Sequence, residues 1–217
     1  DDLRLALRDE GVQPVGEVQD RRHVGGGFSE DHRGGDGGKD GGFVAAVGLA
    51  QLAVQADLGR AGEPERVVAE AGSLDVLVNN VGYAEQRDFL AVTDEQWDEV
   101  WQLNVMSYVR AVRAAVPGMK ERGGGVIVNV SSTAGKRPST GMPDYTVTKA
   151  AVLSLSRLVA DVYAKDGILC NAVAPGPTAS PAWLAAGGLA EQSAERTGKS
   201  REEILEGVGK GRPLGRL

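Results

Sequence analysis

The chain has 217 residues, of which 41% are hydrophobic and 25% charged, as in a single soluble globular domain. The formal net charge is −6 and aromatic residues make up 5%, which argues against nucleic acid as a partner, because phosphate neutralisation requires clustered Lys and Arg. The one cysteine, Cys170, cannot form an internal disulfide, so a reducing, cytoplasmic location is expected. Prolines interrupt the longest uncharged stretch, 168–190, and no signal-like segment opens the chain, so neither membrane insertion nor secretion is predicted.

The first fifty residues differ in composition from the rest of the chain. Glycine pairs and triplets alternate with charged residues over 16–42, and Phe43–Val47 is the one apolar run that could form a strand. Glycine at this density costs more backbone entropy than its few apolar side chains can offset. We therefore interpret 1–50 as an atypical, partly irregular segment. Phe43–Val47 lies too close to the next strand for a parallel crossover, so it should pair antiparallel or at an edge.

From residue 51 to residue 217, short apolar runs alternate with helical patterns. Strands are expected near 53–57, 74–78, 126–130 and 168–173, and helices over 63–71, 93–122 and 145–164. Thr93 and Ser200 are each followed three residues later by Gln or Glu, which predicts a capping box at the start of a helix. This alternation predicts an α/β fold, a Rossmann-like doubly wound sheet with its strands parallel.

Polar or glycine-rich turns follow each of the four expected strands, at 57–58, 79–82, 131–135 and 174–178. In a parallel sheet these turns gather at the carboxyl edge, where ligands bind. The sharpest feature is the pair Tyr145 and Lys149, which stand one helical turn apart. A lysine ammonium beside a phenol would lower the tyrosine pKa from about 10 and make Tyr145 an acid–base group near neutral pH. By itself the pair is a weak signal, because Tyr and Lys at this spacing occur often by chance, and a surface tyrosine beside a solvated lysine is then the favoured interpretation.

Further motifs change that interpretation. Ser132 ends an expected strand thirteen residues before Tyr145, and Asn104 stands inside an apolar helix, where an amide requires a partner. Together with Asn79-Asn80-Val81-Gly82 and Pro175-Gly176, these residues resemble in order and spacing the classical short-chain dehydrogenases/reductases, from about residue 54 to 217. Ser131 then fits better as a packing neighbour, whereas Asn104 could also be a satisfied core amide and Gly82 a turn residue.

The resemblance implies an oxidoreductase that uses NAD or NADP, without a metal, to interconvert a carbonyl and a secondary alcohol, similar to 3-oxoacyl reductases. It implies catalytic roles for Asn104, Ser132, Tyr145 and Lys149. Asn104 would position a water molecule next to Lys149. The implied cofactor-binding residues are Asp57, Leu58, Asn80, Gly82, Tyr145, Lys149 and Thr178. It further implies a homo-oligomer, either dimer or tetramer, and a substrate lid at 178–217, in which Trp183 and Leu184 suggest a hydrophobic substrate.

Two features depart from the family pattern. The glycine-rich phosphate turn that normally follows the first strand has no counterpart; the nearest string, Gly25-Gly26-Gly27, is followed by acidic residues. The chain also stops at Leu217, where the family continues, which suggests a truncated C-terminus and an incomplete sheet. The alternative hypothesis is therefore a non-catalytic or cofactor-deficient remnant of such an enzyme.

Overall fold

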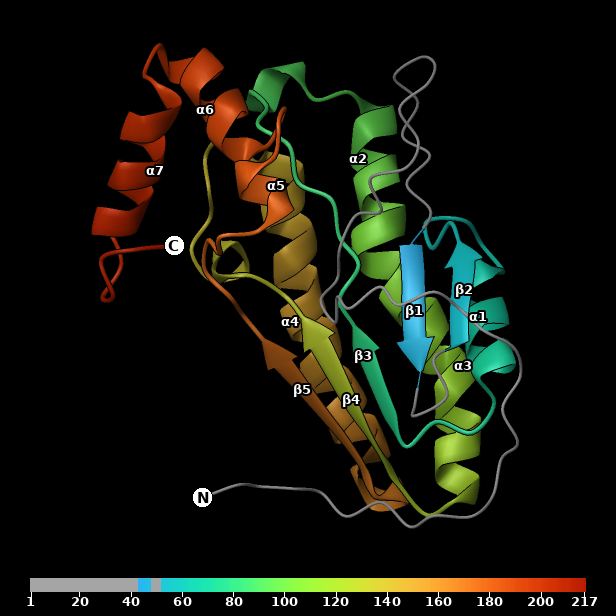
Figure 1. Cartoon of the computed structure of the whole chain (residues 1–217). Helices are drawn as coiled ribbons and strands as arrows, with labels where there is room; N and C mark the ends of the chain where they lie inside the picture. Colours follow the sequence, from blue (N-terminus) through green and yellow to red (C-terminus); the bar gives the residue numbers. More distant parts are fainter. Residues whose placement is uncertain (1–42, 48–51) are drawn as a thin grey trace, which may run out of the picture.

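The computed structural model describes residues 43–47 and 52–217. Its centre is a parallel sheet of β3 (Val76–Asn79), β4 (Gly125–Val130) and β5 (Ile168–Val173), in the order β3-β4-β5 (Figure 1). Each strand is a short, β-branched apolar run, the composition of strands buried within a parallel sheet. The predicted α/β class and three of the four expected parallel strands are thereby confirmed.

The fourth expected strand does not join this sheet. β2 (Leu52–Ala56) pairs antiparallel with β1 (Phe43–Val47) in a separate two-stranded sheet, with Phe43 opposite Ala56. The prediction that 53–57 is a parallel member is therefore wrong, whereas the antiparallel pairing expected of Phe43–Val47 is confirmed. The physical reason is the short connection between Val47 and Leu52, which suits a hairpin and is too short for a parallel crossover. The expectation about residues 1–42 lies outside the described residues.

Helices account for most of the remaining described chain. They are α1 (Glu63–Ala71), α2 (Asp94–Trp101), α3 (Ser107–Glu121), α4 (Pro143–Tyr163), α5 (Pro181–Leu184), α6 (Leu189–Thr197) and α7 (Arg201–Lys210). The capping boxes predicted at Thr93 and Ser200 are both present. A π-helical turn, Gln102–Met106, joins α2 to α3, and such turns often mark functional positions. Within the described ranges, no helix is both long and apolar enough to cross a membrane.

The core lies between the sheet and the helices α3 and α4, which cover one face of it (Figure 1). Ile127 and Ile168 of the sheet pack there with Met119 of α3 and Val159 of α4. A polar ladder crosses the same face. Asn79 Nδ2 donates to Asn129 Oδ1 at 2.8 Å, and Asn129 Nδ2 donates to Ser156 Oγ at 2.9 Å. Buried amides are tolerated because each one has a partner.

The described residues leave the opposite face of the parallel sheet largely uncovered. The exposed fractions of its side chains are 53% for Val76, 58% for Val78, 61% for Leu169 and 50% for Val173. Parallel sheets are normally covered by helices on both faces. The described residues therefore form one covered half of a doubly wound arrangement, and the sheet is incomplete, as the sequence predicted.

Candidate active site

The turns after the three parallel strands are tied together at the carboxyl edge of the sheet. The buried Tyr108 hydroxyl lies 2.9 Å from the Val81 carbonyl oxygen and 3.2 Å from the Val130 carbonyl oxygen, so it can donate to either. The backbone amide of Thr133 donates to the carbonyl of Pro175 at 2.8 Å. The first bridge joins the segments after β3 and β4, and the second joins those after β4 and β5. The predicted convergence is therefore present for three of the four turns, whereas the turn at 57–58 follows β2, which belongs to the separate sheet.

Ser132 and Tyr145 meet at this edge. Ser132 follows β4 and caps a short 3-10 turn, Thr133–Gly135, by accepting a hydrogen bond from the amide of Ala134 at 3.1 Å. Tyr145 stands in the first turn of α4, which Pro143 opens. Burial raises the pKa of the Tyr145 phenol, and a hydrogen bond with Ser132 lowers it by less, so the net pKa is raised. The lowered pKa expected from the Tyr145–Lys149 spacing is therefore wrong, because desolvation favours the neutral phenol.

Lys149 lies one turn further along α4, with its side chain buried. Its ammonium donates to the Val130 carbonyl oxygen at 2.8 Å and lies 5.8 Å from the ring centre of Tyr145 and 5.4 Å from that of Tyr108. Burial lowers the pKa of Lys149 to about 8. Gly82 lies directly against this ammonium, because a Cβ at that position would be 3.1 Å from Nζ. The lysine therefore links the turn after β3 to the end of β4.

Asn104 is fully buried in the π-helical turn. Its Oδ1 accepts from the Tyr83 amide at 2.8 Å, and its Nδ2 donates to the Tyr83 carbonyl and to Thr148 Oγ1, both at 3.0 Å. Its side-chain amide is therefore satisfied within the core, and its catalytic role stays a prediction. It also faces the site, since a Cβ at Gly82 would lie 3.4 Å from Asn104 Oδ1. The proposed water next to Lys149 stays a prediction.

Apart from Ser131, the sequence did not single out the residues that fix α4 against the sheet. Ser131 Oγ donates to the Lys149 carbonyl at 2.7 Å, which agrees with a packing role. Gly135 lies so close to the helix that a Cβ there would be 2.6 Å from the same carbonyl oxygen. At the start of α4, the buried Asp144 forms an ion pair with Arg87, which also pairs with Glu85. These contacts join residues far apart in the sequence, so no local pattern announces them.

The residues expected to bind the adenosine and phosphate side of a cofactor are more exposed. Asp57 and Leu58 follow β2, and the Asp57 carboxylate accepts from the Gly59 amide at 3.0 Å. Asn80 and Thr178 are exposed on the turns after β3 and β5, and the Thr178 hydroxyl donates to the Gly176 carbonyl at 3.1 Å. The structure thus brings Ser132, Tyr145, Lys149, Asn104 and Gly82 together, and leaves Asp57, Leu58, Asn80 and Thr178 on the surrounding turns.

A parallel α/β sheet with serine, tyrosine and lysine at its carboxyl edge defines a Rossmann-like protein built for a ligand at that edge. The sequence pattern of the family described as "short chain dehydrogenase" matches residues 44–187, and the chain belongs to that family. The match ends before α6 and α7, which therefore lie outside the region that defines membership.

Individual relatives agree with this assignment. The chain is 44% identical over 111 residues to "Uncharacterized oxidoreductase YvrD" of Bacillus subtilis, covering 51% of this chain and 42% of that protein. It is 37% identical over 138 residues to 2-dehydro-3-deoxy-D-gluconate 5-dehydrogenase of Dickeya dadantii, covering 61% and 54%. It is 36% identical over 137 residues to the 3-oxoacyl-[acyl-carrier-protein] reductase FabG of Staphylococcus aureus, covering 61% and 56%. The chain thus spans about half the length of these relatives.

Solved structures show the same fold. L-sorbose reductase from Gluconobacter frateurii, in complex with NADPH and L-sorbose, superposes with a TM-score of 0.66 at 32% identity, over 74% of this chain and 62% of that one. A short-chain dehydrogenase/reductase of Burkholderia xenovorans superposes with a TM-score of 0.64 at 28% identity, over 74% and 60%. The Rossmann-like architecture predicted from the sequence is thereby confirmed for the matched part.

Proposed function

We propose that this chain carries the catalytic centre of an NAD(P)-dependent oxidoreductase that interconverts a carbonyl and a secondary alcohol by hydride transfer. The observation that carries the proposal is the contact between the Ser132 hydroxyl and the Tyr145 phenol, with the buried Lys149 ammonium 5.8 Å from the tyrosine ring. A phenol kept neutral by burial can give its proton to a carbonyl oxygen. The family match over residues 44–187 supports the same assignment.

Each of the three side chains has a separate role in this proposal. The raised pKa of Tyr145 keeps its proton available for the oxygen of a carbonyl substrate. The Ser132 hydroxyl donates a second hydrogen bond to that oxygen and so stabilises the negative charge that develops on it. Lys149 provides positive charge behind the phenol, which favours the phenolate after the proton has left. In the reverse direction Tyr145 accepts the proton of the alcohol.

The residues around Lys149 fit the nicotinamide side of a dinucleotide, which when bound exchanges a hydride with the substrate carbon. Gly82 leaves the lysine ammonium open to the turn after β3, since a side chain there would occupy the adjoining space. Asn80 and Thr178 offer exposed polar groups on either side. Asp57 and Leu58 would bind the adenine end.

Fluorescence titration with NADH and NADPH tests this function. We expect both dinucleotides to bind more weakly than micromolar, because the sequence lacks a glycine-rich phosphate turn. Gly82→Ala should weaken binding further, by about tenfold, an energy of about 1.4 kcal/mol, because its Cβ would meet the Lys149 ammonium at 3.1 Å. Gly207→Ala is the control, since a Cβ there meets nothing within 4 Å. Absence of any binding would favour the cofactor-deficient remnant.

We further propose that the chain forms a homo-oligomer through α4. One side of this helix exposes Val147, Leu158 and Val162 by 47%, 59% and 55%, and apolar side chains grouped in this way mark association surfaces. Sedimentation should show a dimer or tetramer that Leu158→Glu dissociates. Arg157→Glu is the control, because the side chain of Arg157 is already 81% exposed and charged. A monomer at high concentration in the unsubstituted chain would contradict the proposal.

A further inference from the structure

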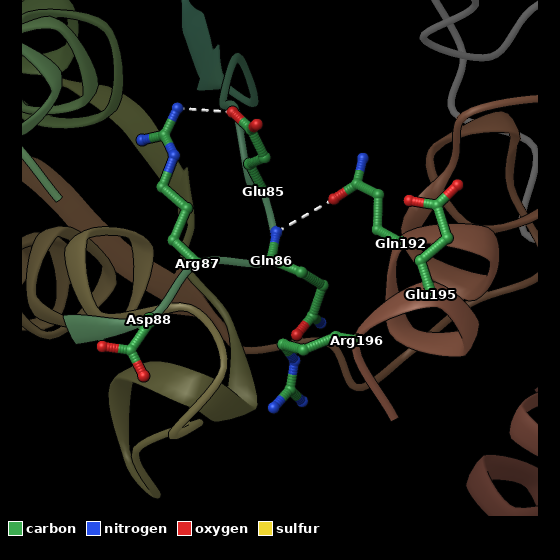
Figure 2. Close-up of a pocket in the computed structure, with 7 residues that line it drawn as sticks. All are labelled: Glu85, Gln86, Arg87, Asp88, Gln192, Glu195 and Arg196. Atoms are coloured by element: carbon green, nitrogen blue, oxygen red, sulfur yellow. Dashed lines mark hydrogen bonds and ion pairs between the residues drawn. The ribbon is translucent and has the colours of Figure 1, made fainter. Parts of the chain in front are cut away.

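A pocket of about 490 Å³ lies between the loop that follows β3 and the helix α6 (Figure 2). Its lining consists of residues 85–88 from the loop and Gln192, Glu195 and Arg196 from the helix. The backbone amide of Gln86 donates to Gln192 Oε1 at 2.9 Å and holds the two walls together. Every lining side chain carries a polar or charged group. Trp183 and Leu184, which suggested a hydrophobic substrate, are not part of this lining.

The corner of the pocket next to Gly141 contains an unused hydrogen-bond acceptor. The side-chain oxygen of Gln86 is buried and accepts no hydrogen bond from any residue of the described ranges. Gly141 lies against both this oxygen and the Arg196 guanidinium, whose Nη2 would be 3.0 Å from a Cβ at Gly141. A buried acceptor without a donor costs free energy, so a ligand hydroxyl that donates to Gln86 would remove this cost.

The charges of the lining decide which ligands fit. The lining contains three carboxylates, those of Glu85, Asp88 and Glu195, and two guanidinium groups, those of Arg87 and Arg196, and this net negative charge disfavours an anionic ligand. Arg87 is held by Glu85 and Asp144, whereas Arg196 forms no ion pair with a described residue and can donate to a ligand. A mixture of carboxylate, amide and guanidinium groups offers hydrogen bonds to hydroxyls, and an apolar chain would leave them unpaired.

The loop that forms the first wall of the pocket also contacts the catalytic edge, although Ser132, Tyr145 and Lys149 do not line the pocket. The loop that carries its first wall begins at Gly82, which lies against Lys149. Arg87 of the same wall binds Asp144, the residue before Tyr145, and its backbone amide donates to the Gly141 carbonyl at 2.8 Å. The first wall of the pocket is thus fixed to the segment that carries Tyr145, so a ligand in the pocket lies beside the catalytic edge.

We propose that this pocket binds the hydroxyl groups of a neutral polyhydroxylated carbonyl compound, a ketose or a close analogue, and that Gln86 and Arg196 determine this specificity. The proposal rests on the oxidoreductase function above, because it names the substrate class of that site. The proposal favours one of the ligand classes named for the relatives over the other two. The net negative charge of the lining disfavours a sugar acid, and its polar surface disfavours an acyl chain.

Ligand-observed NMR on the full chain, without dinucleotide, tests the pocket independently of turnover. The probes are L-sorbose, D-gluconate as a sugar acid and 2-hexanone as an apolar ketone. L-sorbose should bind most tightly. Arg196→Gln and Gln86→Leu should each weaken its binding by about five- to tenfold, the loss of roughly one hydrogen bond. Lys199→Gln removes the same charge from the α6–α7 connection without lining the pocket, and should leave binding unchanged.

Gln86→Leu has a second readout that a structural role would not produce. Because its side-chain oxygen has no partner among the described residues, its removal should keep the melting temperature unchanged or raise it by about 2–4 °C. Equal binding of the three probes, equal effects of Arg196→Gln and Lys199→Gln, or a lowered melting temperature of Gln86→Leu would overturn the proposal. L-sorbose binding without any dinucleotide oxidation would leave the pocket assignment in place and contradict the oxidoreductase function instead.

Discussion

Replacing Tyr145 by phenylalanine is expected to lower the turnover number by about 10²- to 10⁴-fold, the usual contribution of a positioned acid–base group. The substitution removes the proton that Tyr145 transfers to the substrate oxygen in the proposed function, and it keeps the ring that packs beside Lys149. Dinucleotide affinity should fall far less than turnover, because the ammonium of Lys149 remains. The measurement is steady-state oxidation of the reduced cofactor with a ketone substrate, together with the fluorescence titration for binding.

A second tyrosine of the same helix supplies the control. Tyr163, at the end of α4, packs against the core and lies 5.9 Å from the Lys120 ammonium, on the far end of the helix from the site. Tyr163→Phe should therefore leave turnover unchanged. Because the pKa of Tyr145 is raised by burial, the reduction rate should also show no loss between pH 6 and pH 9 that is due to this phenol. Full activity of Tyr145→Phe would rule out its role as the proton donor.

Replacing Lys149 by methionine is expected to abolish turnover and yet stabilise the fold near neutral pH. Burial lowers the pKa of Lys149 from 10.5 to about 8, so the unfolded chain holds this proton more tightly than the folded one. The folded state therefore carries a penalty on the order of 3 kcal/mol below pH 8. Removal of the ammonium should therefore raise the free energy of unfolding by about 1–3 kcal/mol at pH 7. The Val130 carbonyl keeps Tyr108 as a donor at 3.2 Å.

The dependence on pH distinguishes this cause from a general packing effect. The unsubstituted chain should gain stability as the pH rises from about 8 to 10.5, because the unfolded state binds more protons in that window. Lys149→Met should lack this gain, so the difference between the two unfolding free energies should shrink over the same range. Urea unfolding at pH 7 and pH 10 measures it. Lys136→Met, at an exposed position of the loop before α4, is the control, and a constant difference for Lys149→Met would contradict the burial argument.

These expectations separate stability from function at one residue. A buried lysine with a lowered pKa costs stability, and such costs persist where the group is needed for activity. The Gln86 side-chain oxygen, which has no partner among the described residues, is a second position of this kind. If both substitutions stabilise the chain and both impair ligand handling, the two positions belong to one functional edge that extends from Lys149 to α6.

The sequence by itself determined the parts of this protein that depend on local pattern. Runs of β-branched residues located β3, β4 and β5, and the spacing of Tyr145 and Lys149 placed both on one side of α4. The N-caps at Thr93 and Ser200 were predictable from the capping box, a motif that spans only three residues beyond the cap. The alternation of strands and helices predicted parallel strands. The polar turns after β3, β4 and β5 then lie at one edge of the sheet, because the carboxyl ends of parallel strands share that edge.

Only the tertiary structure decided what depends on contacts between distant segments. The direction of the Tyr145 pKa shift follows from what buries the phenol, and a pattern of four residues cannot show this. The antiparallel pairing of β2 was decided by its hairpin with β1. The proximity of Gly82 to Lys149, and of Gln86 to Gly141 and Arg196, joins residues from separate elements. Desolvation and packing are properties of the assembled fold, and for that reason they had no signature in the sequence.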